Sequence, residues 1–279
     1  MSGLPTKGVC RASTAKGYRM NKIALAPTSL PSSPPMEYVH AAANVGYEAI
    51  GLRVFRSPGI TYPFHPIADD AGLAGEVKKA IADSGMEVVD VLSFYIQEEM
   101  DFDAMKAPME FGKEIGAHYA LVIGDDPNWD RMVQSFGRFC DMCAGVGLTA
   151  SIEAPVVGRV IDRTEKAVKL IQDSGRANAV IALDPLHFYR LGESPDALKA
   201  FDARLFPYTQ ITDGAMEGPR CALGEGGVPL YDILDNLTPG LPLSLEWQRD
   251  PSYTPQEWAK RILEQCTAFM ERYYESRSQ

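Results

Sequence analysis

The sequence has no apolar stretch that approaches the roughly 20 residues needed to span a lipid bilayer. It begins without the apolar core of a secretory signal. Its five cysteines are an odd number in a chain of 279 residues, which does not match a disulfide framework and agrees with a reducing compartment. We therefore expect a cytoplasmic protein with no membrane partner.

The sequence also has no long run of Lys or Arg, and its formal net charge is −10 with a pI of about 5.0. An acidic chain repels the phosphates of nucleic acids and of anionic membranes. We therefore expect no nucleic-acid partner and favour a small-molecule substrate. The oligomeric state stays open, a homo-oligomer included.

Cys140 and Cys143 form a CxxC motif, which can be redox-active or supply half of a zinc site. No second Cys pair follows in the sequence. The two cysteines continue an apolar stripe with Met132, Phe136 and Phe139 at helical spacing. We interpret them as residues of a packed core.

From residue 21 onward, short apolar segments alternate with amphipathic ones, as in a parallel sheet with crossover helices. The predicted strands cover residues 22–26, 49–53, 87–94, 119–123, 148–153, 180–184, 207–211 and 241–246. The predicted helices cover residues 34–44, 71–84, 102–115, 127–144, 163–175, 195–201, 230–237 and 255–274. Eight strands and eight helices predict a single (β/α)8 TIM barrel over residues 21–279, preceded by a disordered leader over residues 1–20.

No glycine-rich phosphate loop of the dinucleotide or Walker type follows any predicted strand, which excludes the commonest nucleotide-binding α/β folds. Residues 55–70 form an unusually long connection that contains Pro58, Gly59, Pro63 and Pro66. We interpret this loop as a cover over the mouth of the barrel.

Four predicted strands each deliver one metal-binding side chain at the C-terminal end: Glu153, Asp184, Gln210 and Glu246. The C-terminal ends of the strands of a parallel barrel converge on one mouth, so these side chains are expected to meet. Three carboxylates and one neutral oxygen suit Mn²⁺ or Mg²⁺ and leave positions open for substrate oxygens. The alternative is four unrelated strand ends in solvated loops.

The motifs around these residues are Ser151-Ile152-Glu153, Asp184-Pro185-Leu186-His187, Gln210-Ile211-Thr212-Asp213 and Leu245-Glu246. In their order and strand placement these motifs resemble those of the xylose isomerase-like TIM-barrel superfamily, which includes the sugar phosphate isomerase/epimerase family. The resemblance covers essentially residues 21–274. It implies metal-ligand positions for Glu153, Asp184 and Glu246, a substrate-hydroxyl contact for His187 and a substrate-facing arginine at Arg220.

The chain departs from the family pattern at two positions. Where the family usually has His on the seventh strand, this chain has Gln210, whose neutral carbonyl oxygen favours Mg²⁺ or Mn²⁺ over Zn²⁺. The second strand often ends in Glu in the family, whereas here it ends in Arg53, with Arg56 just beyond. The added positive charge fits an anionic substrate, a carboxylate or a phosphate. An ion pair between Arg53 and a strand-end acid is the alternative.

These features predict a divalent-metal-dependent isomerase or epimerase that acts on a sugar, a sugar phosphate or a related keto acid through an enediolate. Glu153 and Glu246 are the predicted acid–base pair, and His187, Arg220 and Arg53 are predicted to bind the substrate.

Three alternatives remain. If the enediolate expels a β-hydroxyl, the same site is a dehydratase; the family's 3-dehydroshikimate dehydratases are similar in placing Gln among the metal ligands, and their substrate carries a carboxylate. A non-catalytic barrel that binds metal and sugar is the alternative of a different class. The third alternative is a DNA-repair endonuclease of the same superfamily. Those enzymes are similar but have several further His ligands at the site, and the four histidines of this chain count against this alternative.

Overall fold

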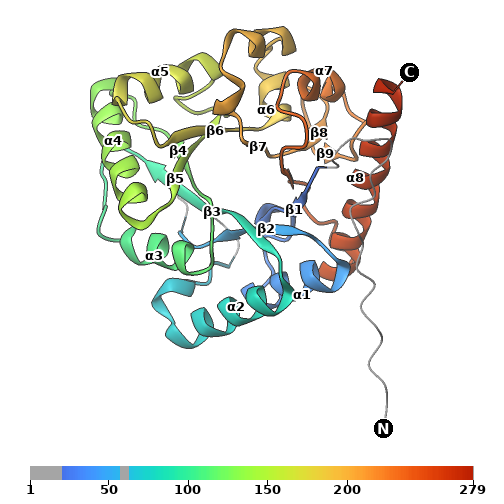
Figure 1. Cartoon of the computed structure of the whole chain (residues 1–279), viewed down its shortest axis with the longest axis horizontal. Coiled ribbons are helices and arrows are strands. Elements are labelled where there is room, and N and C mark those ends of the chain that lie inside the picture. The colour runs from blue at the N-terminus through green and yellow to red at the C-terminus, as the bar shows by residue number, and fades with distance from the viewer. Residues whose placement is uncertain (1–20, 57–62, 279) are drawn as a thin grey trace.

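Eight parallel strands close into a barrel in the order β1-β10-β7-β6-β5-β4-β3-β2 (Figure 1). The structure is a computed structural model that describes residues 21–56 and 63–278. The barrel strands are β1 (Ile23–Leu25), β2 (Ala49–Arg53), β3 (Glu87–Ile96), β4 (Tyr119–Gly124), β5 (Thr149–Ala154), β6 (Ala179–Leu183), β7 (Tyr208–Thr209) and β10 (Leu243–Leu245). The predicted (β/α)8 barrel is confirmed. The predicted leader, residues 1–20, lies outside the described residues.

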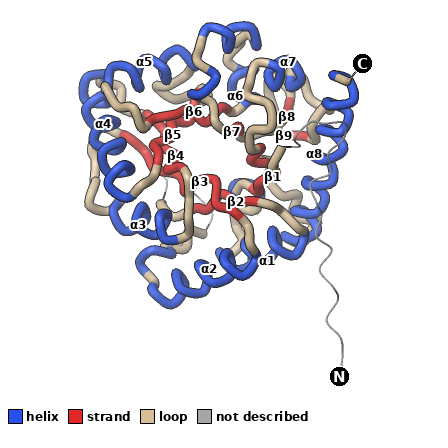
Figure 2. The backbone as a smooth tube through the Cα atoms, in the orientation of Figure 1, coloured by secondary structure: helices blue, strands red, loops and turns tan. Residues whose placement is uncertain are grey.

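Helices surround the strands on the outside of the barrel (Figure 2). They are α1 (Pro35–Val45), α2 (Ala71–Ser84), α3 (Lys106–Glu114), α4 (Trp129–Val146), α5 (Thr164–Ser174), α6 (Pro185–Arg190), α7 (Leu230–Asp235) and α8 (Pro255–Arg277). Gly46, Gly85, Gly147 and Gly175 end α1, α2, α4 and α5 with positive φ angles, the left-handed conformation that glycine adopts without strain. None of the helices in the described part of the chain is long and apolar enough to cross a membrane.

The largest differences from the predicted elements lie after β6 and β7. The segment predicted as a helix over residues 195–201 is a 3₁₀ helix, Pro195–Ala200. An unpredicted helix, α6, instead begins directly after β6, because Asp184 caps it and Pro185 occupies its first turn. After β7, two short antiparallel strands, β8 (Asp213–Gly214) and β9 (Arg220–Cys221), form a hairpin beside the barrel. Both unpredicted elements carry predicted substrate contacts.

The main core lies between the strands and the surrounding helices, and it contains the apolar face of α4. Cys140 and Cys143 are fully buried there with free thiols, which confirms that they pack in the core. A second, smaller cluster that includes Ala24, Ala49 and Tyr208 lies inside the barrel. Side chains fill the interior of such a barrel, and here the large Tyr208 ring shares the interior with the small side chains of Ala24 and Ala49.

The loop predicted to cover the mouth is described only in part, since residues 57–62 lie outside the described residues. In its second half, Ile67 is fully buried in the main core, and the Asp70 side chain caps α2. The far end of the loop is therefore anchored to the barrel wall. Its role as a cover stays a prediction.

Candidate active site

The four predicted metal ligands lie at the C-terminal ends of four neighbouring strands. Glu153 is in β5, and Asp184, Gln210 and Glu246 directly follow β6, β7 and β10. Each residue is at most 8% exposed. An unpaired buried charge is strongly unfavourable, so a buried carboxylate either keeps its proton or is neutralised by a cation.

The tightest group among these side chains includes His187. Within residues 21–56 and 63–278, the ligating atoms of Glu153, Asp184 and His187 all lie within 4.8 Å of one another. The His187 Nε2 atom lies 3.6 Å from Asp184 Oδ2. Sequence reasoning placed His187 against the substrate, and the structure puts its side chain beside Glu153 and Asp184, two of the predicted metal ligands.

Asp184 acts in two ways, one for each carboxylate oxygen. Its Oδ1 atom accepts hydrogen bonds from the backbone N–H groups of Leu186 and His187 at 2.7 and 3.1 Å. These bonds start α6 and place His187 three residues after Asp184, on the same helical face. The Oδ2 atom is left to face His187 and Arg220.

Glu246 is held by a clamp on its two chain neighbours. The Ser29 hydroxyl donates to the Leu245 carbonyl oxygen at 2.8 Å and accepts from the Trp247 N–H at 2.9 Å. Ser29 is fully buried in the connection that follows β1. The clamp fixes the backbone on both sides of Glu246 and so limits where its carboxylate can point.

Arg220 reaches the carboxylates from the β8–β9 hairpin. Its Nη2 atom lies 2.9 Å from Glu246 Oε1 and 3.3 Å from Asp184 Oδ2. The guanidinium thus lies between two of the predicted metal ligands. Sequence reasoning assigned Arg220 to the substrate and did not foresee this ion pair.

The electrostatics of the site follow from burial and from like charges. Burial raises the pKa of Glu153 well above its ordinary value, and the negative charges of Glu246 and Asp184 raise it further. The Arg220 guanidinium acts in the opposite direction. A group of carboxylates that destabilise one another when ionised is suited to a divalent cation.

Unpaired buried atoms give a test of whether the residues fit such a cation. No described residue provides a hydrogen-bond partner for Gln210 Oε1, Glu246 Oε2 or His187 Nδ1, although all three atoms are buried. Buried polar atoms without partners are uncommon in folded proteins and call for an explanation such as an ion. The oxygen-rich set fits a hard or borderline divalent cation, and the imidazole adds a donor that zinc also accepts.

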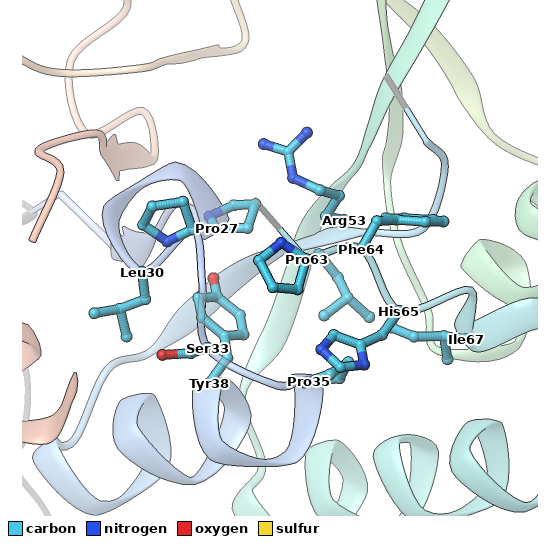
Figure 3. A pocket seen from close by; sticks show the side chains of 12 residues that line it. Pro27, Leu30, Ser33, Pro35, Tyr38, Arg53, Pro63, Phe64, His65 and Ile67 are labelled. Atoms are coloured by element: carbon cyan, nitrogen blue, oxygen red, sulfur yellow. The ribbon is translucent and has the colours of Figure 1, made fainter. Parts of the chain in front are cut away.

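Arg53, the third predicted substrate contact, lies at the end of β2 beside a small cavity of about 40 Å³. Its wall includes Tyr38, Pro63 and His65 (Figure 3). In that view the Arg53 guanidinium extends away from His65. The Arg53 charge lowers the pKa of Asp90, against the larger upward effect of burial, which indicates that Arg53 lies near the barrel interior.

A buried network below the site was not predicted from the sequence. The Tyr208 hydroxyl lies 3.1 Å from both Asp90 Oδ2 and Ser151 Oγ, and its ring stacks on Tyr119. These residues join β3, β4, β5 and β7 through the barrel interior. Asp90 is a single acid within an apolar strand segment, and that was the available signal.

Asp90 is expected to make the protein less stable as the pH rises. Burial raises its pKa from an ordinary 3.8 to about 7, so between these values the folded protein retains a proton that the unfolded chain has lost. The stabilisation is complete below pH 3.8 and is lost as the pH rises through about 7. Between pH 5 and 8 the loss should be on the order of 3 kcal/mol.

Asp90→Asn should remove this component, because an amide does not titrate. Denaturant unfolding of chelator-treated wild type and Asp90→Asn at both pH values measures the difference. An equal loss of stability in the two proteins would contradict a proton held on Asp90.

Comparisons with known proteins identify the fold. A family model described as xylose isomerase-like TIM barrel matches residues 39–271. No curated protein matches the sequence. A solved fusion protein, a xylose isomerase-like TIM barrel joined to 4-hydroxyphenylpyruvate dioxygenase, is similar over 91% of this chain with 18% identity and a TM-score of 0.73. The chain spans 43% of that longer protein.

Three other solved structures are covered almost completely by the chain. IOLI protein with a bound zinc atom has 16% identity and a TM-score of 0.70, with coverage of 90% of this chain and 99% of that one. D-Allulose 3-epimerase from Methylomonas sp. in complex with D-allulose has 14% identity and a TM-score of 0.67, with coverage of 91% and 98%. The probable 3-DHS dehydratase AsbF from Bacillus anthracis has 16% identity and a TM-score of 0.69, with coverage of 88% and 98%. These likenesses establish a shared fold.

Proposed function

The chain belongs to the xylose isomerase-like TIM barrel family, and on that basis we propose that it is a divalent-metal-dependent isomerase or epimerase of a sugar, a sugar phosphate or a related keto acid. The observation that carries the proposal is the buried group of Glu153, Asp184 and Glu246 at the mouth of the barrel. Members of the same fold include a D-allulose 3-epimerase, which is consistent with chemistry on a polyhydroxylated substrate.

The proposed metal ligands are Glu153, Asp184, Gln210 and Glu246, and the proposed metal is Mn²⁺ or Mg²⁺. Support comes from the unpaired buried oxygens of Gln210 and Glu246. When bound, a divalent cation supplies Lewis-acid chemistry that lowers the pKa of the C–H group between a substrate carbonyl and its neighbouring hydroxyl.

Glu153 and Glu246 are the proposed acid–base pair. They come from β5 and β10, which are separated by β6 and β7 in the barrel, so their carboxylates approach a bound substrate from different sides. One glutamate removes a proton from carbon and leaves an enediolate. The other returns a proton, on the opposite face in an epimerisation or at the neighbouring carbon in an isomerisation.

His187, Arg220 and Arg53 are the proposed substrate contacts. The buried Nδ1 atom of His187 has no partner among the described residues, so it is available to a substrate hydroxyl. Arg53 ends β2, which lies across the barrel from β6, and provides a positive charge that suits a carboxylate or a phosphate.

A dehydratase is the second candidate, and Gln210 favours it. The family's 3-dehydroshikimate dehydratases are similar in placing Gln among the metal ligands, and Arg53 supplies a contact for a substrate carboxylate. The probable dehydratase AsbF shares the fold at similar coverage. In this case the enediolate expels a β-hydroxyl, and water is the second product.

Product analysis separates these functions. The purified protein, loaded in turn with Mn²⁺, Mg²⁺ and Zn²⁺, should convert at least one member of a panel of ketoses, sugar phosphates and 3-keto acids. A product of unchanged mass identifies an isomerase or epimerase, and loss of 18 mass units, the mass of one water, identifies a dehydratase. Binding without conversion across the panel would favour a non-catalytic barrel.

His187→Ala should separate substrate binding from metal binding. We expect kcat/KM to fall by roughly 10–100-fold, as for the loss of one buried hydrogen bond to substrate, while metal content stays near that of the wild type. Metal analysis and thermal unfolding accompany the kinetics. Loss of metal from a folded His187→Ala protein would make His187 a ligand, and a lowered Tm with normal kinetics would make it structural.

A further inference from the structure

Arg220 occupies a place that a metal ion would need. Its Nη2 atom contacts both Asp184 Oδ2 and Glu246 Oε1, and its side chain is 19% exposed. Glu246 is absent from the group of ligating atoms that lie within 4.8 Å of one another in the described chain, and the guanidinium lies between it and Asp184. The positive charge of Arg220 therefore balances carboxylates that a divalent cation would otherwise balance.

Both oxygens of Asp184 have hydrogen-bond partners while Arg220 stays in this place. Its Oδ1 atom accepts two backbone hydrogen bonds that start α6, and its Oδ2 atom faces Arg220 and His187. Glu246 differs, because its Oε2 atom has no hydrogen-bond partner among the described residues and is available to a ligand. Arg220 and a metal ion therefore compete at Asp184.

The backbone around Arg220 is held by hydrogen bonds that do not involve the Arg220 side chain. The side chain can therefore move while the hairpin keeps its place. The Asp213 carboxylate accepts hydrogen bonds from four backbone N–H groups of the segment around Arg220, those of Gly214, Gly224, Gly226 and Val228. Arg190 donates to the carbonyl oxygens of Ala215 and Gly218 in the same hairpin. The buried Nε atom of Arg220 has no partner in the described part of the chain, so little beyond the two carboxylates fixes the guanidinium.

We propose that Arg220 is an internal cation that a divalent metal displaces from Asp184, after which the released guanidinium binds an oxygen of the substrate. The inference rests on the proposed metal site and adds an order of events, in which metal binds before substrate. Two cations repel each other strongly at contact distance in a buried site, so the metal ion and Arg220 cannot both occupy this place.

Calorimetric titration of chelator-treated protein with Mn²⁺ tests the displacement. Arg220→Gln should bind Mn²⁺ about tenfold more tightly than the wild type or better, because the competing charge is gone. Arg220→Met is a second uncharged variant that serves if Arg220→Gln does not fold. Arg159→Gln is the matched control; Arg159 pairs with Asp125 and is 36% exposed, so its loss should change affinity by less than about threefold.

Equal or weaker Mn²⁺ binding by the uncharged Arg220 variants would overturn the displacement and make Arg220 a support for the ligands. In that case the metal site itself stands, since the wild type still binds. Failure of the wild type and of all variants to bind any divalent cation would overturn both the metal site and the displacement.

Discussion

Glu153→Gln is expected to lose about 10²–10⁴-fold in turnover while it keeps its divalent cation. Glutamine retains a carbonyl oxygen for the metal and cannot exchange a proton with carbon. The same result is expected for Glu246→Gln, because proton removal and proton return are both required for turnover. Rates of product formation and metal content of each variant measure the two effects separately.

Glu110→Gln is a matched control for these variants, since Glu110 is exposed on α3, outside the candidate site. Its turnover should equal that of the wild type. If Glu153→Gln and Glu246→Gln both retained full turnover, the acid–base assignment would be wrong. Loss of the metal from either folded variant would show that the carboxylate charge is needed for metal binding.

Asp184→Asn is expected to lower metal affinity by more than the 10–100-fold that loss of an outer-shell partner costs. Asparagine keeps an oxygen to cap α6, so the local fold should survive. The negative charge at Oδ2, which faces His187 and Arg220, is lost. Calorimetric titration with Mn²⁺ measures the change.

Asp70→Asn provides the control, because Asp70 caps α2 in the same way and is not among the candidate ligands. It should bind Mn²⁺ as the wild type does. Metal affinity within about threefold of the wild type in folded Asp184→Asn would remove Asp184 from the ligand set.

The barrel and the places of the four strand-end residues were predictable from the sequence, because each rests on a regular signal. Strands β2 and β5 are each a short apolar run, and the residue that ends each run can be identified directly from the sequence. The parallel arrangement then brings Glu153 and Glu246 to one mouth. The predicted limits of β2 match the structure, and those of β5 differ by one residue.

Helix α6 and the β8–β9 hairpin have weaker signals in the sequence. Helix α6 is six residues long, and each strand of the hairpin has two residues, which is too short for a periodic pattern. The motif Asp184-Pro185 carries a helix-capping signal as well as a metal-binding carboxylate at a strand end, and the second role alone does not predict a helix. The contacts of Arg220 with Asp184 and Glu246 depend on the hairpin, so sequence spacing does not predict them.

The network of Asp90, Tyr208 and Ser151 was missed for a different reason. A prediction based on the residues at strand ends does not cover polar residues in the middle of a strand, where a parallel barrel is normally apolar. The hydrogen bond between β3 and β7 through the interior depends on the room that Gly51 leaves, since a Cβ atom at Gly51 would lie 2.4 Å from Asp90 Oδ1. That room is a property of the closed barrel and is not visible in any one segment.

The most direct measurement of the central claim is solvent deuterium incorporation at the carbon next to the substrate carbonyl, followed by NMR in D₂O. With Mn²⁺ or Mg²⁺ restored after chelation, the wild type should exchange this hydrogen in at least one ketose, sugar phosphate or keto acid. Chelated wild type and the metal-loaded double variant Glu153→Gln/Glu246→Gln should not. Exchange that is equally fast without metal, or absent from every substrate with metal bound, would contradict a metal-dependent enzyme that works by proton transfer at carbon.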